Sequence, residues 1–78
     1  MEYDYEAIDE ATLALMFLTR THGDAATWKG YDWDTTNRLH EKGLLGNPTT
    51  KNKSIPLTIE GQAKCEELFK KLFVKEAE

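Results

Sequence analysis

The sequence predicts an α+β fold with three helices and a small antiparallel β-hairpin. Apolar residues recur with the 3.6-residue period of a helix in residues 5–20 and 58–74. Residues 32–43 lie between an aspartate that can cap a helix and a glycine that can end one. Two short apolar runs, 44–45 and 54–58, flank a segment rich in turn residues, which is typical of a hairpin.

The first predicted helix, residues 5–20, contains no internal glycine or proline. Its expected buried face consists of the residues at helical spacing: Ile8, Ala11, Leu15 and Met16, with Thr12 as the one polar member. This face is widened by three further apolar residues, Leu13, Phe17 and Leu18. The helix is therefore either central to a small core or part of a dimer interface. Gly23 is the expected stop, and Asp9 and Glu10 are expected on the solvated surface.

The second predicted helix, residues 32–43, follows a short segment at 24–30 that is expected to be extended. Asp32 is the expected N-cap, and Gly43 is expected just past the C-terminus. The expected buried face consists of Trp33, Thr36, Leu39 and a packed, hydrogen-bonded His40. The expected solvated face consists of Asp34, Thr35, Arg38, Glu41 and Lys42.

A hairpin and a third helix complete the predicted domain. The hairpin runs from Leu44–Leu45 through a turn at 46–49 to a return strand at 54–58. Thr58 is the expected cap of the last helix, and Gly61 lets that helix approach a neighbouring backbone closely. The expected buried stripe of this helix consists of Cys65, Leu68, Phe69, Leu72 and Phe73.

This order of elements resembles the winged-helix domains of bacterial regulators. The run Arg38-Leu39-His40-Glu41-Lys42-Gly43-Leu44-Leu45 is similar to the end of their recognition helix, and Leu57-Thr58-Ile59-Glu60-Gly61 to the end of their wing. The resemblance covers about residues 5–75 and implies a winged-helix-like fold whose hairpin is the wing. A helix-turn-helix also needs a supporting helix. Because only eight residues separate Gly23 from Asp32, we expect that helix to be shortened or missing.

A narrower resemblance comes from the run Trp28-Lys29-Gly30-Tyr31-Asp32-Trp33-Asp34, together with Arg38 to Leu44 and Lys53-Ser54. These residues are similar to a small bacterial family of unknown function. That resemblance implies no activity.

Composition excludes several classes of protein. The net charge is −4, and residues 1–19 carry five acidic and no basic side chains, so the N-terminus is not typical of a signal peptide. The longest apolar run, Leu13 to Leu18, is six residues, whereas a membrane helix needs about 20. One cysteine forms no internal disulfide. We therefore expect a soluble, cytoplasmic, single domain over residues 1–78 without membrane contact.

The chemistry-bearing residues do not form a recognisable catalytic or metal-binding pattern. His22 and His40 are eighteen positions apart, which is not a metal-ligand spacing. Cys65 lies on an apolar stripe, where a buried thiol has a raised pKa and is a poor nucleophile. No glycine-rich phosphate loop is present. We expect no enzymatic activity, no cofactor and no small-molecule substrate.

Two sets of residues are candidate binding sites. Candidate nucleic-acid contacts are the cations and amide of the wing and its surroundings: Lys51, Asn52, Lys53, Lys29 and Arg38. Candidate protein contacts are the aromatic residues Trp28, Tyr31 and Tyr5, since tryptophan and tyrosine are enriched as interface anchors. Trp28 and Tyr31 could equally fill the core, and the sequence leaves both alternatives open.

The sequence favours a protein partner, or a second copy of the chain in a homodimer, over nucleic acid. Proteins that bind DNA normally present a positive field to the phosphates, whereas this chain is acidic. The alternative is a DNA-binding transcriptional regulator that uses the wing and the helix at residues 32–43.

Overall fold

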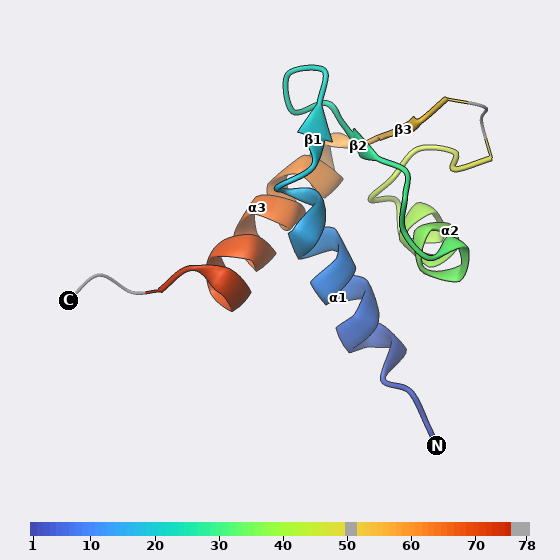
Figure 1. Cartoon of the computed structure of the whole chain (residues 1–78), viewed down its shortest axis with the longest axis vertical. Helices are drawn as coiled ribbons and strands as arrows, with labels where there is room; N and C mark the ends of the chain where they lie inside the picture. Colours follow the sequence, from blue (N-terminus) through green and yellow to red (C-terminus); the bar gives the residue numbers. More distant parts are fainter. Residues whose placement is uncertain (50–51, 76–78) are drawn as a thin grey trace.

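A computed structural model describes residues 1–49 and 52–75 and confirms an α+β fold of three helices and a small antiparallel sheet. The elements occur in the order shown in Figure 1: α1 (Tyr5–Met16), β1 (Arg20–Thr21), β2 (Ala26–Trp28), α2 (Trp33–Glu41), β3 (Ser54–Pro56) and α3 (Ile59–Phe73). The strands lie across one end of the molecule, and α1 and α3 diverge from it (Figure 1). The second and third helices agree with the prediction to within two residues at each end.

The sheet has the strand order β1-β2-β3 and is antiparallel throughout. The return strand of the expected hairpin, β3, pairs mainly with β2, where Thr27 lies opposite Ile55. Leu45 contributes one isolated bridge, to Leu57, so the hairpin predicted between 44–45 and 54–58 is reduced to a single pair. Two hydrogen bonds make this pair, from the Gly46 amide to the Pro56 carbonyl at 2.8 Å and from the Thr58 amide to the Leu44 carbonyl at 3.2 Å. The ladder stops there because Pro56 has no N–H to extend it.

The first helix ends at Met16, four residues earlier than predicted. Residues of the β1–β2 hairpin donate hydrogen bonds to backbone carbonyls that a longer helix would use for its own hydrogen bonds. The Thr27 hydroxyl donates to the Met16 carbonyl at 3.3 Å, and the Trp28 amide donates to the Thr19 carbonyl at 3.1 Å. Gly23 serves the turn of this hairpin, at a φ of 63°, rather than the end of the helix.

The face that α1 buries also differs from the prediction. Its buried residues are Asp9, Leu13, Ala14 and Met16. Leu15, which the helical period placed inside, is exposed. The helix is rotated because an acidic residue, Asp9, finds cationic partners on α2, and Leu15 turns outward as a result.

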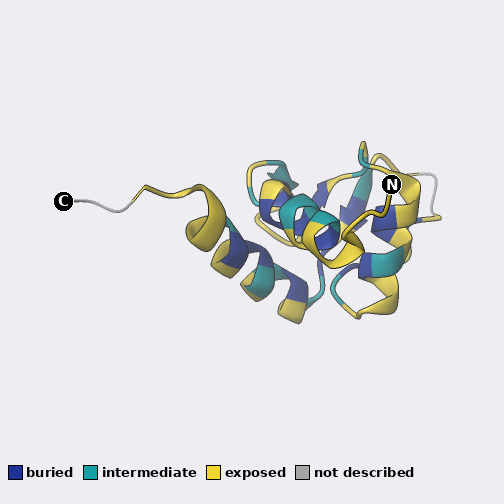
Figure 2. Cartoon of the chain, turned by 90° about the horizontal axis from the view of Figure 1, so that it is seen from below, coloured by how far each residue is buried: buried dark blue, intermediate teal, exposed yellow. Residues whose placement is uncertain are grey.

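The core is built from aliphatic side chains and one thiol, contributed by all three helices, β3 and the segments around it: Leu13, Ala14, Met16, Leu39, Leu45, Ile55, Leu57, Cys65 and Leu68. Figure 2 shows these buried residues where the helices and the sheet meet. Trp33 is not among them. It is 78% exposed, contrary to the prediction, because the Asp32 cap places it at the first helical position, on the outer side of α2.

The space for a supporting helix is occupied by β2 and a short connection. Only residues 29–32 separate β2 from α2, so the expected absence of that helix is confirmed. This connection carries the chain directly from the sheet into α2.

The third helix packs closely on the segment that follows α2. Its N-cap Thr58 accepts a hydrogen bond from the Gly61 amide at 2.9 Å and donates one to the Gly43 carbonyl at 2.7 Å. A Cβ at Gly61 would collide with the carbonyl of Leu44. The expected close approach at Gly61 is therefore confirmed.

None of the helices in the described part of the chain is long and apolar enough to cross a bilayer. The longest, α3, has 15 residues, compared with the ~20 that a span requires.

We expect Gly61→Ala to lower the free energy of unfolding by about 2 kcal/mol or more, since overpacking against rigid backbone outweighs the ~1 kcal/mol gain in helix propensity. Gly30→Ala is the matched control, because its added Cβ would meet nothing within 4 Å. Denaturant unfolding of both variants measures the difference. Equal stabilities would contradict the close approach of α3 to Leu44.

We also expect Leu39→Ala and Leu68→Ala each to destabilise the domain by roughly 2–5 kcal/mol, as truncation of buried leucines does. Both side chains are almost fully buried. Leu18→Ala is the control, since that side chain is exposed and its truncation should change stability by less than about 0.5 kcal/mol. Thermal melts that match wild type for the two core variants would show that the core is assigned incorrectly.

Candidate functional site

The structure brings four of the predicted site residues around one surface hollow of about 580 Å³. They are Trp28, Lys29, Tyr31 and Lys53, and Thr19 and Gly30 complete the lining. The two lysines are far apart in sequence, and the backbone amide of Lys29 donates to the carbonyl of Lys53 at 2.9 Å. This bond continues the β2–β3 pairing and holds both lysines at the same hollow.

The two aromatic residues of this hollow differ in how firmly they are held. The Tyr31 hydroxyl lies 3.0 Å from that of Thr19, which in turn lies 2.8 Å from that of Thr27. Tyr31 is half-buried and packs against the core cluster. Trp28 is 50% exposed. The sequence left open whether these two residues fill the core; Tyr31 does so in part, and Trp28 faces solvent.

A second hollow, of about 310 Å³, shares Lys29 with the first and is also lined by Trp33, Thr36, Asn37, Pro48 and Thr49. We call the combined surface of Trp28, Lys29, Tyr31, Trp33 and Lys53 the aromatic face. Sequence reasoning missed Trp33 as a surface residue. The position directly after the Asp32 cap was the signal that could have identified it, because the first helical residue often points outward.

The remaining predicted wing residues lie elsewhere or outside the described residues. Asn52 is exposed and lines a separate hollow with His22 and Ser54. Lys53 lines both that hollow and the first one. Lys51 lies outside the described residues.

Arg38, a predicted nucleic-acid contact, points into the protein and binds Asp9 of α1. Its Nε and Nη2 atoms each lie 2.8 Å from Asp9 Oδ1. The guanidinium also covers the ring of Tyr5, 4.7 Å from the ring centroid. Arg38 and Tyr5 therefore join α1 to α2 and do not belong to the aromatic face.

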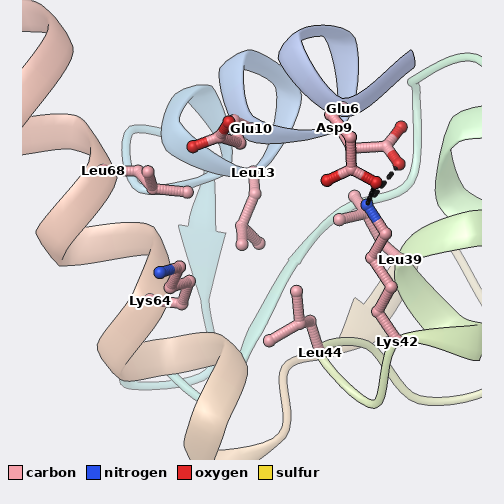
Figure 3. A pocket seen from close by; sticks show the side chains of 9 residues that line it. All are labelled: Glu6, Asp9, Glu10, Leu13, Leu39, Lys42, Leu44, Lys64 and Leu68. Atoms are coloured by element: carbon pink, nitrogen blue, oxygen red, sulfur yellow. Dashed lines mark hydrogen bonds and ion pairs between the residues drawn. The ribbon is translucent and has the colours of Figure 1, made fainter.

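The other oxygen of Asp9 binds Lys42, whose Nζ lies 2.8 Å from Asp9 Oδ2 and 3.2 Å from Glu6 Oε1 (Figure 3). Thr35 extends the network: its hydroxyl donates to Asp32 at 2.9 Å and accepts from Arg38 at 3.1 Å. These bonds explain why Thr35 is buried, although the sequence placed it on the solvated face.

Asp9 is 2% exposed, whereas the sequence placed it on the solvated surface beside Glu10. Burial by itself raises the pKa of the Asp9 carboxyl, but the hydrogen bonds from Arg38 and Lys42 lower it below its ordinary value. The same hydrogen bonds raise the pKa values of Arg38 and Lys42. The three groups are therefore all charged at neutral pH.

Cys65 and His40, which could act as nucleophile and base, each make a hydrogen bond to a backbone carbonyl. Cys65 is fully buried, burial raises the pKa of its thiol, and its Sγ donates to the Gln62 carbonyl at 3.3 Å. His40 is hydrogen-bonded through Nδ1 to the Leu45 carbonyl at 2.9 Å, as expected. It is exposed, however, and not packed as the sequence predicted. Within residues 1–49 and 52–75, no group of three or more His, Cys, Asp or Glu residues is arranged to hold a metal ion.

Comparison with known proteins gives one family and one relative. The model of a family described as a domain of unknown function, DUF6429, matches residues 4–75. The relative is "Uncharacterized protein y4hR" from Sinorhizobium fredii (strain NBRC 101917 / NGR234), 52% identical over 75 residues, which cover 96% of this chain and 100% of the relative. No solved structure matches the chain. The expected resemblance to a bacterial family of unknown function agrees with these matches, and the description of neither match names a winged-helix family.

We expect Asp9→Asn to lower the free energy of unfolding by about 1–3 kcal/mol at neutral pH, because two cations lose their common partner. The value is below that of a fully buried pair since Arg38 and Lys42 are partly exposed. Because the folded pKa of Asp9 is lowered, its contribution is present above the ordinary value of about 3.9 and is lost as pH falls through the folded value.

Chemical denaturation at neutral pH and below about pH 4 measures this contribution. Glu10→Gln is the control, because Glu10 is an exposed neighbour on the same helix. If Asp9→Asn and Glu10→Gln are equally stable at neutral pH, the ion pairs of Asp9 with Arg38 and Lys42 do not hold α2 against α1.

Proposed function

The chain belongs to the DUF6429 family, and we propose that it is a non-enzymatic protein-binding module whose aromatic face receives a segment of its partner. The observation that carries this proposal is the exposure of Trp28 and Trp33 on a rigid support. They are 50% and 78% exposed, and β2 and the capped first turn of α2 hold their backbones.

Exposed tryptophans in such a small domain favour recognition of another molecule. Tryptophan and tyrosine bury large apolar surfaces with few rotatable bonds, and they dominate the binding energy of protein interfaces. The hydrogen bond between Tyr31 and Thr19 fixes the ring at the floor of the first hollow before any partner binds. This preorganisation lowers the entropy lost on association.

The charge of the aromatic face indicates the chemistry of the partner. Lys29 and Lys53 line the same hollow as Trp28 and Tyr31. A partner segment that places an aliphatic or aromatic side chain in the hollow would pack on the rings, and an Asp or Glu beside it would lie next to the exposed Lys53. We therefore propose an acidic, partly apolar peptide segment as the ligand.

A DNA-binding regulator on a winged-helix-like scaffold is the second candidate, and the basic wing is its support. Asn52 and Lys53 directly precede β3 and line one hollow, in the segment that corresponds to the wing if the resemblance to winged-helix domains holds. The arrangement of α2 favours the first candidate, because its cation Arg38 and that of its C-cap residue, Lys42, both bind Asp9. The exposed residues of α2 include Trp33, Asp34 and Glu41, which suit a protein surface better than phosphates.

The absence of enzymatic activity is part of the same proposal. Among the described residues, the hollow beside Trp28 is lined by no histidine, cysteine or carboxylate. The polar side-chain groups of its lining residues are the ammonium groups of Lys29 and Lys53, the hydroxyls of Thr19 and Tyr31 and the indole N–H of Trp28, which suit binding rather than acid–base chemistry at neutral pH.

Selection of a phage-displayed library of random peptides on the immobilised full chain tests the proposal. We expect enrichment of sequences with Asp or Glu next to a large apolar residue. Trp28→Ala should weaken binding of an enriched peptide by at least about tenfold, as loss of an interface anchor does. Lys53→Ala should weaken it less and mainly through the association rate.

Two controls make the result specific. Ile59→Ala removes another exposed apolar side chain, at the start of α3, and should leave peptide binding unchanged. Mobility-shift experiments with random duplex DNA at low salt test the second candidate. Micromolar DNA binding that weakens steeply with salt, and that Lys51→Ala with Lys53→Ala abolishes, would overturn the protein-binding proposal.

A further inference from the structure

Three hydroxyl groups form a chain that leads from the core to the hollow beside Trp28. The Tyr31 hydroxyl oxygen lies 3.0 Å from that of Thr19, which lies 2.8 Å from that of Thr27. Thr27 is fully buried, and its hydroxyl oxygen lies 3.3 Å from the Met16 carbonyl oxygen. Tyr31 and Thr19 line the hollow. The chain therefore begins at a buried carbonyl and ends at the wall of the hollow.

The buried carbonyl determines the direction of these hydrogen bonds. Each hydroxyl has one proton to donate, and a carbonyl oxygen can only accept. In one direction Tyr31 donates to Thr19, Thr19 donates to Thr27, and Thr27 donates to the carbonyl, which makes three internal hydrogen bonds. In the other direction Thr27 donates to Thr19 and Thr19 donates to Tyr31, which makes two. The first direction is favoured because it uses every proton within the protein.

The chemistry of the two kinds of hydroxyl favours the same direction. The ring of Tyr31 withdraws electron density from its oxygen, so this phenol is a stronger donor and a weaker acceptor than the aliphatic hydroxyl of Thr19. Thr19 is also placed to donate to the Met16 carbonyl, at 3.4 Å, and in that arrangement it again accepts the Tyr31 proton. A phenol oxygen that donates its proton inward can only accept from a ligand.

We propose that Tyr31 determines the specificity of the hollow by selecting a partner group with an N–H or O–H donor. This inference rests on the proposed binding function of the aromatic face and adds the chemistry that the hollow selects. An acceptor placed against the Tyr31 oxygen would bring lone pairs together. A purely apolar group would leave that oxygen without a partner once water is excluded, which is unfavourable. An indole or amide N–H avoids both costs, and the Asp or Glu of the partner lies beside Lys53 instead.

The hollow is large enough for the selection to be tested with small aromatic probes. Its volume is about 580 Å³, whereas a cavity of about 150 Å³ accommodates benzene. Indole and benzofuran are a matched pair of probes because they have the same shape and differ in one group. Indole has an N–H donor where benzofuran has an oxygen.

Titration of the full chain with indole and with benzofuran tests the proposal, with the NMR shifts of the backbone amides of Lys29, Gly30 and Tyr31 as the readout. We expect indole to bind about three- to tenfold more tightly, the difference that one neutral hydrogen bond makes. Tyr31→Phe keeps the ring and removes the oxygen, so this preference should be lost.

The two ways in which this experiment can fail are distinguishable. If wild type binds indole and benzofuran equally, Tyr31 does not select a donor, while the hollow still binds aromatic groups as the proposed function requires. If neither probe shifts the amides around the hollow, both the selection by Tyr31 and the proposed function of the aromatic face are wrong.

A second variant tests the direction of the hydroxyl chain. Thr19→Val keeps the shape of the side chain but removes the oxygen that accepts the Tyr31 proton, so the phenol can donate to a ligand. Quinoline, which has a nitrogen acceptor and no donor, should then bind about three- to tenfold more tightly than it binds wild type. A purely structural effect of the substitution would weaken the binding of every probe.

Thr21→Val is the matched control, because the Thr21 hydroxyl lies 3.3 Å from that of Ser54 and is not part of the chain that leads to Tyr31. This variant should bind quinoline as wild type does. Quinoline binding that is unchanged or weaker in Thr19→Val would show that Tyr31 does not donate to Thr19, and would overturn the proposal.

Discussion

The carboxylate of Asp9 is the interaction on which the arrangement of the helices depends. It is almost fully buried on α1 and accepts hydrogen bonds from Arg38 and Lys42 of α2. A buried carboxylate without cationic partners would be strongly unfavourable, so its presence fixes the rotation of both helices. Leu13 and Leu39 then face the core, and Leu15 turns to solvent. The positive charge of α2 is directed inward as a consequence, which leaves Trp33 and acidic side chains on its outer face.

The shortness of the connection between the sheet and α2 explains why the aromatic residues gather on one surface. β2 ends at Trp28 and α2 begins at Trp33, so both tryptophans flank a connection with little freedom. The hydrogen bond from the Lys29 amide to the Lys53 carbonyl and the one between the hydroxyls of Tyr31 and Thr19 hold this connection against the segment before β3 and the segment between α1 and β1. A supporting helix in its place would separate the two tryptophans. Its absence therefore accounts both for the departure from a helix-turn-helix and for the aromatic face.

The small size of the domain explains why so much apolar surface stays outside. Domains of this length bury a smaller fraction of their surface than larger ones, and the core is already filled by aliphatic residues and Cys65. Trp28, Trp33, Leu72 and Phe73 therefore remain exposed, in two separate places.

Local signals in the sequence determined the three helices and the caps of α2 and α3. Asp32 and Thr58 cap their helices through their own side chains, and Gly43 adopts a positive φ, so each of these features depends on a few neighbouring residues. Residues far apart in the chain decided the burial of Asp9, the early end of α1 and the exposure of Trp33. The carboxylate of Asp9 is buried only because Arg38 and Lys42 reach it, and α1 ends at Met16 because Thr27 binds its last turn. Periodicity describes which residues share a helix face but not which way that face turns, and the polar partners across the core made that choice.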